Sequence, residues 1–406
     1  MASETDFDIA IVGGGLVGAA LAVALSKSYE RHRIALIEQH AIARSDASAH
    51  YDDRSVAIAH GTRLIFAQIG LDDIFSERCT PIKKIHVSQR GRFGATRMCA
   101  AEEHVPALGY VVENRVLGSA LFECIYTQSN VTVLDKRQVN AANDTGASVE
   151  LQLTNTDVNE NISTRLLVAA DGADSPLRER AGIKAREHDY GQSAVIANIS
   201  VENGHDNTAY ERFTDSGPLA LLPLNDDRCS LVLTVKTEQR EAVMQLDDDA
   251  FIEFVQTRFG RRMGAFTKVG QRSAFDLRRV TAEKSGSGRL LLLGNARHFL
   301  HPVAGQGFNL AMRDVATLAE VLADHAALEY PADVIASIDS QRRTDHNKLD
   351  SVTDALARLF TIPFAPLSHA RSGALVATDL IPFVRHDLAR HAMGLKNRLA
   401  NIRAVG

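Results

Sequence analysis

The sequence lacks the features that mark several classes of protein. There is no basic excess: 45 Lys and Arg stand against 50 Asp and Glu, a net charge of -5, whereas a nucleic-acid-binding domain usually carries a clear positive surplus. The cysteines are few, stand far apart and form no C-x-x-C pair, which argues against a metal knuckle or a disulfide framework; they are Cys79, Cys99, Cys124 and Cys229. We therefore expect a soluble, cytoplasmic protein that binds no nucleic acid.

Long apolar segments are also scarce. Only residues 9–25 are mostly apolar and free of charge, and no other segment is long enough to cross a bilayer. A signal peptide would have Lys or Arg before this run, where the chain has Glu4, Asp6 and Asp8. Four glycines interrupt it. We interpret the run as a buried strand, a turn and a helix.

What is present begins with a dinucleotide-binding pattern. Residues 7–12 read as a buried strand, GGGLVG at 13–18 follows at once, and residues 16–28 have a helical composition. A second strand at 33–37 closes with Glu38. This order of strand, G-x-G-x-x-G, helix, strand and acid is that of a Rossmann-type βαβ unit.

Each part of that pattern has a physical role. Gly13 permits the tight turn, Gly15 lets a pyrophosphate approach the backbone, and Gly18 lets the helix sit close to the strand. The helix N-terminus offers free N–H groups and partial positive charge to the phosphates. Glu38 can accept hydrogen bonds from both ribose hydroxyls and would repel a 2′-phosphate. The pattern indicates FAD or NAD rather than NADP.

Two later segments repeat the plan of a buried strand that ends in a polar, glycine-rich turn. A strand at 165–170 runs into DGADSPLR at 171–178, and a strand at 289–293 runs into GNARH at 294–298. HPVAGQGFN at 301–309 then opens a helix. In open α/β sheets such strand ends gather at the ligand crevice.

The second and third motifs resemble the D-G-A-D-S-x-x-R and G-D-A-x-H-x-x-x-P-x-x-G-x-G-x-N motifs of flavin hydroxylases of the p-hydroxybenzoate hydroxylase type. The resemblance implies a mixed α/β fold with a Rossmann-type FAD-binding domain, an interposed sheet domain and a helical C-terminal region. The expected boundaries are 1–75, 109–185 and 284–345 for the FAD-binding domain, 76–108 and 186–283 for the substrate domain, and 346–406 for the C-terminal region.

Further segments resemble the ubiquinone-biosynthesis hydroxylases. The segment around Arg54 is similar to their D-x-R-x-x-A-L motif, and residues 85–91, 109–113 and 211–220 are similar to the branch that acts on 2-octaprenyl-6-methoxyphenol. Asn295, where most of the wider family has Asp, also suits this branch. In the R-x-x-L-x-x-x-L segment, the spacing places Asn114 rather than Arg115 at the arginine position, and either side chain is a candidate for the flavin site.

The motifs and the resemblance together imply a set of site residues. Gly305 and Gly307 would bring backbone N–H groups and a helix N-terminus to the flavin pyrimidine ring, where reduced flavin carries negative charge. The full set of cofactor-binding residues is Gly13, Gly15, Gly18, Glu38, Arg54, Asn114, Arg115, Asp171, Gly172, Asp174, Gly294, Asn295, Gly305, Gly307 and Asn309. No catalytic residue is assigned, and the residues expected to line the flavin environment are His298, His301 and Pro302.

Structural alternatives stand beside these roles. Asp171 and Asp174 are also suited to capping a turn, with Arg178 paired to one of them. His298 and His301 have a spacing that suits a metal pair, but no third ligand joins them, and we expect no metal.

The implied activity is that of an FAD-dependent monooxygenase. NAD(P)H would reduce the flavin, O2 would give a flavin C4a-hydroperoxide, and one oxygen atom would pass to 2-octaprenyl-6-methoxyphenol to form the 1,4-benzoquinol. Because only one dinucleotide fingerprint is present, NAD(P)H would bind transiently. The alternatives are a sister hydroxylase acting on another ring position and a non-catalytic, FAD-containing subunit of the quinone-biosynthesis assembly.

Two regions are less specific. Residues 193–198 and 229–234 alternate like strands with one apolar face and are expected in the substrate-facing sheet. From Arg358 onward the chain carries a net +5, which leaves -10 for the remainder. This segment fits either contact with the inner face of a membrane or with a partner protein of ubiquinone biosynthesis, or a helical cap with a solvated basic side. Both interpretations stay open.

Overall fold

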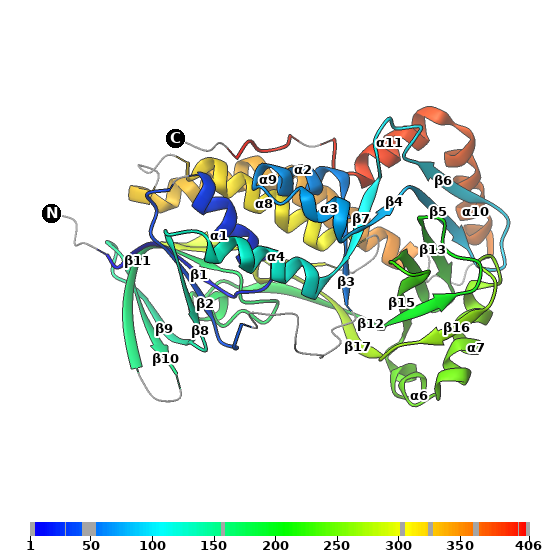
Figure 1. The fold of residues 1–406 in the computed structure, drawn as a ribbon, viewed down its shortest axis with the longest axis horizontal. Helices are drawn as coiled ribbons and strands as arrows, with labels where there is room; N and C mark the ends of the chain where they lie inside the picture. The colour runs from blue at the N-terminus through cyan, green and yellow to red at the C-terminus, as the bar shows by residue number, and fades with distance from the viewer. Residues whose placement is uncertain are drawn as a thin grey trace.

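The computed structural model of the chain describes residues 5–28, 30–42, 54–155, 159–300, 305–323, 328–359, 365–396 and 398–402. Its strands form an eight-stranded, a nine-stranded and a three-stranded sheet. In Figure 1 the first of these lies at the left with helices above it, and the second lies at the right. The long strands β12 (Ala185–Val201) and β17 (Ser273–Ala282) extend between the two regions. This mixed α/β architecture confirms the expected fold class.

The first sheet has a parallel centre with strand order β19-β11-β1-β2-β8, and β19 also pairs with the short antiparallel strand β18. An antiparallel hairpin of β9 and β10 extends from the first half of β11. The strands are β1 (Phe7–Val12), β2 (Ile34–Glu38), β8 (Val131–Asp135), β9 (Gln138–Asp144), β10 (Val149–Thr154), β11 (Asn159–Ala169), β18 (Gly286–Ser287) and β19 (Leu290–Leu292).

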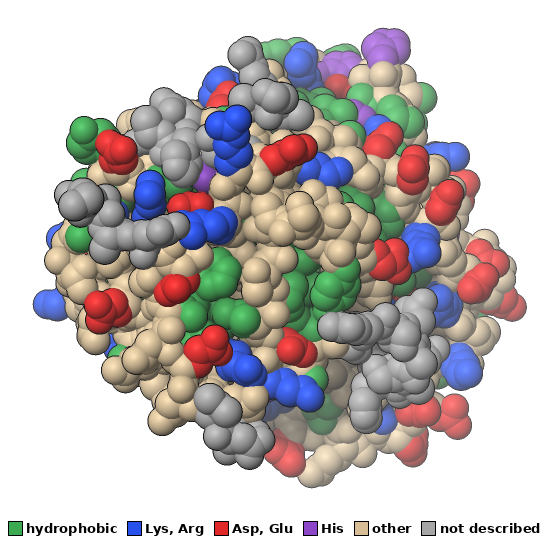
Figure 2. All heavy atoms as spheres, turned by 60° about the vertical axis from the view of Figure 1, so that its left-hand side comes forward, with side chains coloured by type: hydrophobic (Ala, Val, Ile, Leu, Met, Phe, Trp, Pro, Cys, Tyr) green, Lys and Arg blue, Asp and Glu red, His purple; other side chains and the backbone are tan. Residues whose placement is uncertain are grey.

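Both faces of this parallel centre are buried. Successive side chains of a strand point to opposite faces, so Ile9 and Ile11 of β1 join the core under the helices while Ala10 joins a second core with Leu151 of β10. This explains why the strand sequences are almost continuously apolar. Figure 2 brings the left-hand side of Figure 1 forward. Acidic and basic side chains are interspersed over this face of the molecule, as is typical of a solvated surface.

Three helices cover one face of the first sheet: α1 (Leu16–Ser28), α4 (Asn114–Tyr126) and α8 (Gln306–Val321). In α1 every residue from Gly18 to Ser26 is buried. The apolar run of residues 9–25 is therefore a strand, a turn and a buried helix, as the sequence predicted. The 29-residue helix α9 (Pro331–Leu359) packs on α8.

The second sheet has the order β20-β17-β12-β15-β14-β13-β5-β6, with β16 paired to β12. Its neighbours are antiparallel except β13 and β5. The predicted strands 193–198 and 229–234 lie within β12 and β15. The remaining strands are β5 (Lys84–Gln89), β6 (Ala95–Cys99), β13 (Thr208–Thr214), β14 (Gly217–Pro223), β15 (Arg228–Lys236), β16 (Phe266–Val269) and β20 (His298–Phe299).

One face of the second sheet is fully packed. Leu219 and Leu221 of β14 and Leu231 and Leu233 of β15 form a core with α7 (Asp248–Phe259). The short α6 (Arg240–Met244) closes the same face. α6 and α7 do not cover the opposite face of this sheet.

The three-stranded sheet connects the two larger ones. It consists of β3 (Ser55–Ala59), β7 (Gly109–Glu113) and β4 (Thr80–Ile82), all antiparallel. Between β3 and β4 the chain forms α2 (His60–Gln68) and α3 (Asp73–Glu77). The short elements are α5 (Pro176–Arg180), η1 (Thr237–Gln239) and η2 (Gly294–Ala296). The domain boundaries given above stay a prediction.

The C-terminal helices pack on the second sheet. α10 (Ala365–Leu380) and α11 (Pro382–Ala392) both contact β6. Residues 398–402 then return to the first core, where Ile402 N donates to Gln68 Oε1 at 2.8 Å. Within the described part of the chain, no helix is long and apolar enough to span a membrane.

Candidate functional site

The strand register brings the three glycine-rich motifs into one row. Val12 of β1 lies beside Ala169 of β11, and Ala169 lies beside Leu292 of β19. The row continues past the strand ends, since Ala170 N donates to Val12 O at 2.8 Å and Leu293 N donates to Ala169 O at 2.9 Å. Loops that are more than 100 residues apart in sequence therefore leave the same edge of the sheet, where parallel sheets bind ligands.

The three glycines of the first motif differ in what surrounds them. Gly13 has a φ of +108°, and a Cβ there would lie 2.3 Å from Ala170 O. A Cβ on Gly18 would lie 2.0 Å from Gly13 O. A Cβ on Gly15 would meet nothing within 4 Å, and this residue is exposed. The outer two glycines are required by packing, whereas the middle one leaves open space in front of the N-terminus of α1, where the first N–H groups of a helix have no partner within it.

Glu38 is tied to the glycine loop. Its Oε2 accepts from Gly14 N at 2.7 Å, and its Oε1 accepts from His40 N at 2.9 Å. A Cβ on Gly14 would lie 3.0 Å from Glu38 Cβ, so the second glycine of the loop is needed for this approach, a role the motif alone did not reveal. The half-buried carboxylate keeps further lone pairs for a ribose.

Asp171 supplies a carboxylate oxygen that lacks a partner. Its Oδ2 accepts a long bond from Leu177 N at 3.4 Å, while Oδ1 is buried with no hydrogen-bond partner among the described residues. Burial raises the pKa of Asp171, partly opposed by its hydrogen bond with Ser175. The next residue, Gly172, has a φ of +97° and open space where a Cβ would stand. Such a buried, unsatisfied acceptor fits the hydroxyl groups of a bound ligand.

Arg178 and Asp174 have structural partners. The buried Arg178 donates to Ala173 O at 2.8 Å and to Ala296 O at 3.0 Å, which links the second motif to the third instead of pairing with either aspartate. Asp174 is exposed and forms an ion pair with Arg278 of β17 at 2.6 Å. Its expected role in cofactor binding stays a prediction.

The third motif approaches the same place. Gly294 has a φ of +59°, and a Cβ there would lie 3.2 Å from Val17 Cγ1 of α1, while Asn295 is exposed. Gly305, with a φ of +58°, precedes α8, and Gly307 has open space in place of a Cβ. The N-terminus of α8 is thus open to a ligand. His301 and Pro302 lie outside the described residues.

The Asn309 side chain links α8 to β3 through hydrogen bonds. Its Oδ1 accepts from Ala59 N at 2.8 Å, and its Nδ2 donates to Ala57 O at 2.9 Å and Gly305 O at 2.8 Å. The residue is buried. Both amide N–H groups are used and Oδ1 keeps one lone pair, so Asn309 holds the α8 N-terminus against β3. Its expected role in cofactor binding stays a prediction.

Arg54 and Asn114 lie together at the edge of the three-stranded sheet. Asn114 N donates to Arg54 O at 3.0 Å, and the Arg54 guanidinium lies 5.8 Å from the centre of the Phe275 ring. Asn114 Oδ1 is buried without a partner among the described residues, whereas Arg115 pairs with Glu113 at 2.6 Å. The geometry favours Asn114 over Arg115 as a ligand-binding group.

Sequence reasoning missed a buried ionic network behind the third motif. Asp314 of α8 accepts from His346 Nε2 at 2.8 Å and from Arg342 Nε at 2.6 Å, both on α9. The His298 ring lies edge-on to the His346 ring, 4.4 Å away, and burial, with His346 second, lowers the pKa of His298 to about 3. His298 is therefore neutral. Spacing within α9 gives i, i+4 neighbours, but the partner on α8 is visible only in the fold.

The donor set matches FAD from one end to the other. Glu38 suits the adenosine ribose, the open loop at Gly15 suits a pyrophosphate, and Asp171 with the N-terminus of α8 suits the ribityl chain and the pyrimidine ring of the flavin. The described residues contain no cluster of three or more side chains able to hold a metal ion.

A sheet-edge FAD site facing a second, antiparallel sheet defines the class of flavin-dependent monooxygenases. Solved structures share the fold: p-nitrophenol 4-monooxygenase PnpA from Pseudomonas putida has a TM-score of 0.81 at 16% identity, covering 97% of this chain and 99% of that one. PqsL from Pseudomonas aeruginosa, a probable FAD-dependent monooxygenase, has a TM-score of 0.74 at 21% identity, covering 91% and 99%.

The sequence narrows the class further. The FAD binding domain family matches residues 6–349. Ubiquinone hydroxylase UbiL of Rhodospirillum rubrum is 35% identical over 95% of this chain and 89% of its own length, and 3-demethoxyubiquinol 3-hydroxylase of Escherichia coli is 30% identical over 96% and 98%. The chain belongs to the FAD-dependent monooxygenases of the ubiquinone-biosynthesis hydroxylase family. The predictions of FAD as cofactor and of monooxygenase activity are confirmed at this level.

Proposed function

We propose that this protein hydroxylates a polyprenylated phenol, with 2-octaprenyl-6-methoxyphenol as substrate and the 1,4-benzoquinol as product. The observation that carries the proposal is the row of flavin motifs facing the uncovered side of the second sheet. The resemblance of residues 85–91, 109–113 and 211–220 to the branch acting on this phenol supports the ring position. The similarity to the E. coli relative named for 3-hydroxylation favours, as a second candidate, a sister hydroxylase acting on another position.

The protein's part in such a reaction is binding and exclusion of water. Bound FAD supplies oxygen transfer from O2 once NAD(P)H has reduced it. The first motif, Glu38 and Asp171 fix the cofactor along the sheet edge, and the N-terminus of α8 stabilises negative charge beside it. The second sheet then holds the phenol ring.

The test is hydroxylation by the purified, FAD-loaded protein. Short-chain analogues of each candidate phenol would be supplied with NADH or NADPH and O2, and the product position determined by mass spectrometry and NMR. We expect one phenol to stimulate NAD(P)H oxidation with a matching yield of one quinol. NAD(P)H oxidation that yields only hydrogen peroxide with every phenol would contradict the proposal. Rescue of a strain lacking the hydroxylase would confirm the substrate in the cell.

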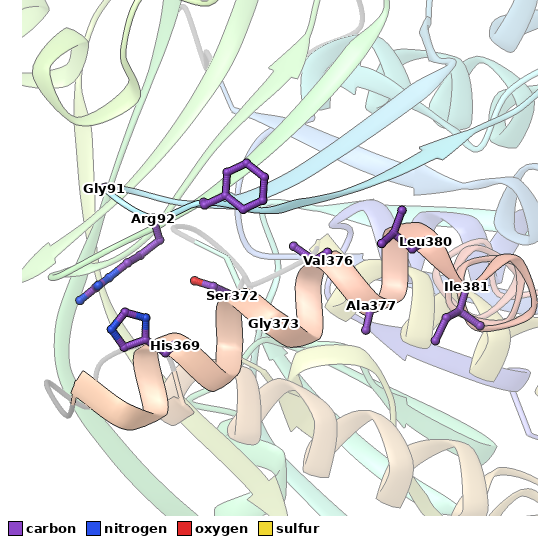
Figure 3. A pocket seen from close by; sticks show the side chains of 10 residues that line it. Gly91, Arg92, His369, Ser372, Gly373, Val376, Ala377, Leu380 and Ile381 are labelled. Carbon is purple, nitrogen blue, oxygen red and sulfur yellow. The ribbon is translucent and has the colours of Figure 1, made fainter.

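We also propose that the protein contacts a membrane surface through an apolar groove between the β5–β6 turn and α10. The groove has a volume of about 780 Å³. In Figure 3, Val376 and Leu380 lie on the side of α10 that faces the strands. It is lined by Gly91, Arg92, Phe93, His369, Ser372, Gly373, Val376, Ala377, Leu380 and Ile381.

The exposed apolar side chains carry this proposal. Phe93 is 89% exposed, Leu380 72% and Phe383 76%, and exposed apolar groups that gather in one place mark interaction sites. A bilayer is the occupant we propose, because a polyprenylated substrate resides there and the groove borders the substrate-facing sheet. The exposed, basic Arg92 at its rim suits anionic headgroups.

The proposal of a membrane contact does not rest on the basic residues of the C-terminal segment. Arg385 pairs with Glu102 at 3.1 Å, Arg398 pairs with Glu320 at 2.7 Å, and Lys396 pairs with Asp387. Glu102 and Glu320 lie outside the segment and offset two of its net +5 charges, so the basic surface is smaller than the sequence alone suggests.

We expect Phe93→Ser combined with Leu380→Ser to reduce binding to vesicles of anionic phospholipid by at least tenfold in a flotation assay, while FAD content is unchanged. Each inserted Phe or Leu side chain contributes about 1.5–3 kcal/mol. Tyr330→Ser, at a residue 62% exposed and outside the groove, is the matched control. Unchanged vesicle binding of the double variant would exclude the groove as the membrane contact.

A further inference from the structure

The face of the second sheet that α7 does not cover carries the carboxyl group of Glu211 in a central position. On β13, Glu211 lies beside Ala220 of β14 and beside Val87 of the parallel strand β5. Residues opposite one another across paired strands share a face. The α7 side of β14 carries Leu219 and Leu221, so Ala220 and Glu211 point to the other side.

The same face can be followed to the flavin motifs. Ala220 lies beside Val232 of β15, and Val232 lies beside Ile196 of β12. Two residues along on this face, Thr234 of β15 lies beside Ala194, which in turn lies beside Phe275 of β17. Phe275 is the ring approached by the Arg54 guanidinium. The face that bears Glu211 is therefore the one that looks toward the predicted flavin site.

Two further contacts fix this orientation. β20, which lies within the third motif, pairs with β17 at the edge of the same sheet. At the other end, Ile82 and Val111 of the three-stranded sheet pack against Ala209 on β13. The third motif therefore adjoins the sheet at its β17 edge and the three-stranded sheet packs on it at β13, while the side chains between them keep partial exposure, including Glu211, Ala220, Leu222 and Val232.

Glu211 has no partner in this setting. No ion pair or hydrogen bond of its side chain is found among the described residues, and the strand neighbours on its face are apolar. Burial raises the pKa of Glu211 to about 7. An unpaired carboxyl group on an apolar surface costs folding free energy, and such locally unfavourable groups are expected where a ligand completes the site.

We propose that Glu211 binds the phenolic hydroxyl of the substrate and accepts its proton during hydroxylation, a catalytic role that rests on the proposed function. The carboxylate accepts a hydrogen bond from the ring O–H. The oxygen donor would be supplied by bound FAD with NAD(P)H and O2. As the ring carbon forms its bond to the donor's outer oxygen, the O–O bond of the donor would break and its electron pair would stay on the inner oxygen. The phenolic O–H bond breaks at the same time and its electron pair enters the ring system, and loss of the proton on the hydroxylated ring carbon then restores the aromatic ring. The phenolic proton moves to a carboxylate oxygen of Glu211. A base that titrates near the working pH is well matched to this transfer.

The test compares Glu211→Gln with Glu253→Gln, a matched change at an exposed residue of α7 on the opposite side of the sheet. The probes are 2-methoxy-6-prenylphenol and its O-methyl ether, which lacks the proton. We expect the wild-type, FAD-loaded protein to bind the phenol about tenfold more tightly than the ether in equilibrium dialysis. Glu211→Gln keeps a weaker, neutral acceptor and should retain only part of this preference, whereas Glu211→Leu should lose it. Both variants should keep their FAD, and Glu253→Gln should behave as wild type.

Turnover gives the second measurement. For wild type, kcat/KM for the phenol should rise with pH and level off above about 7. In Glu211→Gln it should fall about 100-fold and lose this pH dependence. If wild type hydroxylates the phenol and Glu211→Gln keeps both the rate and the pH profile, Glu211 is not the base, although the proposed function stands.

The remaining outcomes also decide the proposal. If wild type hydroxylates no phenol, the proposed function fails, and the preference for phenol over ether in the binding measurement still decides whether Glu211 recognises a hydroxyl. If both Glu211→Gln and Glu211→Leu fail to fold, the carboxyl group is a structural partner within the sheet, and the proposal is overturned.

Discussion

Two buried acids in different regions of the molecule contrast in how their charge is compensated. Asp314, between α8 and α9, is 3% exposed. Burial by itself raises its pKa, but His346 and Arg342 outweigh that effect and hold the pKa of Asp314 far below its usual range. Glu211, on the face of the second sheet opposite α7, has no such partner within the part of the chain that the structure describes, and burial raises its pKa to about 7.

The contrast distinguishes buried groups that stabilise the fold through their partners from groups that we expect to gain a partner when a ligand binds. A buried network in which each charged group faces an opposite charge fixes two helices relative to one another, and here it lies directly behind the third flavin motif. The same distinction applies to the first motif. Gly18 is required because another atom already occupies the place of its Cβ, whereas Gly15 has empty space there.

The largest expected effect comes from breaking the glycine comparison. Gly15→Val should abolish FAD retention, because the branched side chain fills the space of the pyrophosphate, while circular dichroism shows a folded protein. Gly18→Val should instead prevent folding, since its Cβ would lie 2.0 Å from Gly13 O. The flavin absorbance per protein measures the first effect. Stoichiometric FAD in folded Gly15→Val protein would overturn the assignment of the N-terminal site.

The next effect tests the paired acid. Asp314→Ala should lower the free energy of unfolding by about 3–5 kcal/mol, because His346 would stay buried without its acceptor and the buried Arg342 would keep only Asp345 as a partner. Urea denaturation of the two proteins measures this loss. Asp174→Ala is the control: its pair with Arg278 is exposed, so about 0–1 kcal/mol is expected. Equal losses for the two variants would remove the distinction between the buried network and a surface ion pair.

Local patterns predicted the first sheet and its motifs well, because each motif is a contiguous strand and turn. The position of β1, the helix after it and the acid at Glu38 follow from spacing of a few residues. The partner of Asp314 lies 32 residues away on another helix, and Arg178 reaches Ala296 O across 118 residues. Such contacts depend on how elements pack, which no local pattern contains.

The sequence alone also could not predict on which face of the sheet Glu211 lies. Residues 211–220 were recognised as a family segment, but alternation defines two faces without saying which one is covered. That requires the pairing of β13 with β5, more than 100 residues earlier, and the placement of α7. The same limit applies to the C-terminal basic residues, since the acids that pair with Arg385 and Arg398 lie at positions 102 and 320.

A smaller effect tests whether Glu38 serves the ligand or only the loop. Glu38→Ala should weaken FAD binding by about 1–3 kcal/mol, the loss expected for charged hydrogen bonds. Glu38→Gln keeps an acceptor for Gly14 N and should lie between the variant and wild type. Fluorescence titration of the apoprotein with FAD measures both. Unchanged affinity in Glu38→Ala would show that the carboxylate only organises the loop.

The smallest effect sharpens the comparison of the two acids through pH. Below about pH 4.5, the ordinary value for Glu, Glu211 is protonated in both the folded and the unfolded chain and costs nothing. As pH rises toward 7 the unfolded chain releases this proton first, so folding becomes less favourable, and above about 7 the cost is constant. Each unit of pKa difference corresponds to about 1.4 kcal/mol, and partial exposure reduces the total to about 1 kcal/mol.

The unfolding free energy of Glu211→Gln minus that of wild type should therefore grow by about this amount between pH 4.5 and 7 and then level off, while the same difference for Glu253→Gln stays flat. A difference for Glu211→Gln that does not change with pH would mean that the carboxylate is as well solvated or paired in the folded protein as in the unfolded chain, and the contrast with Asp314 would then disappear.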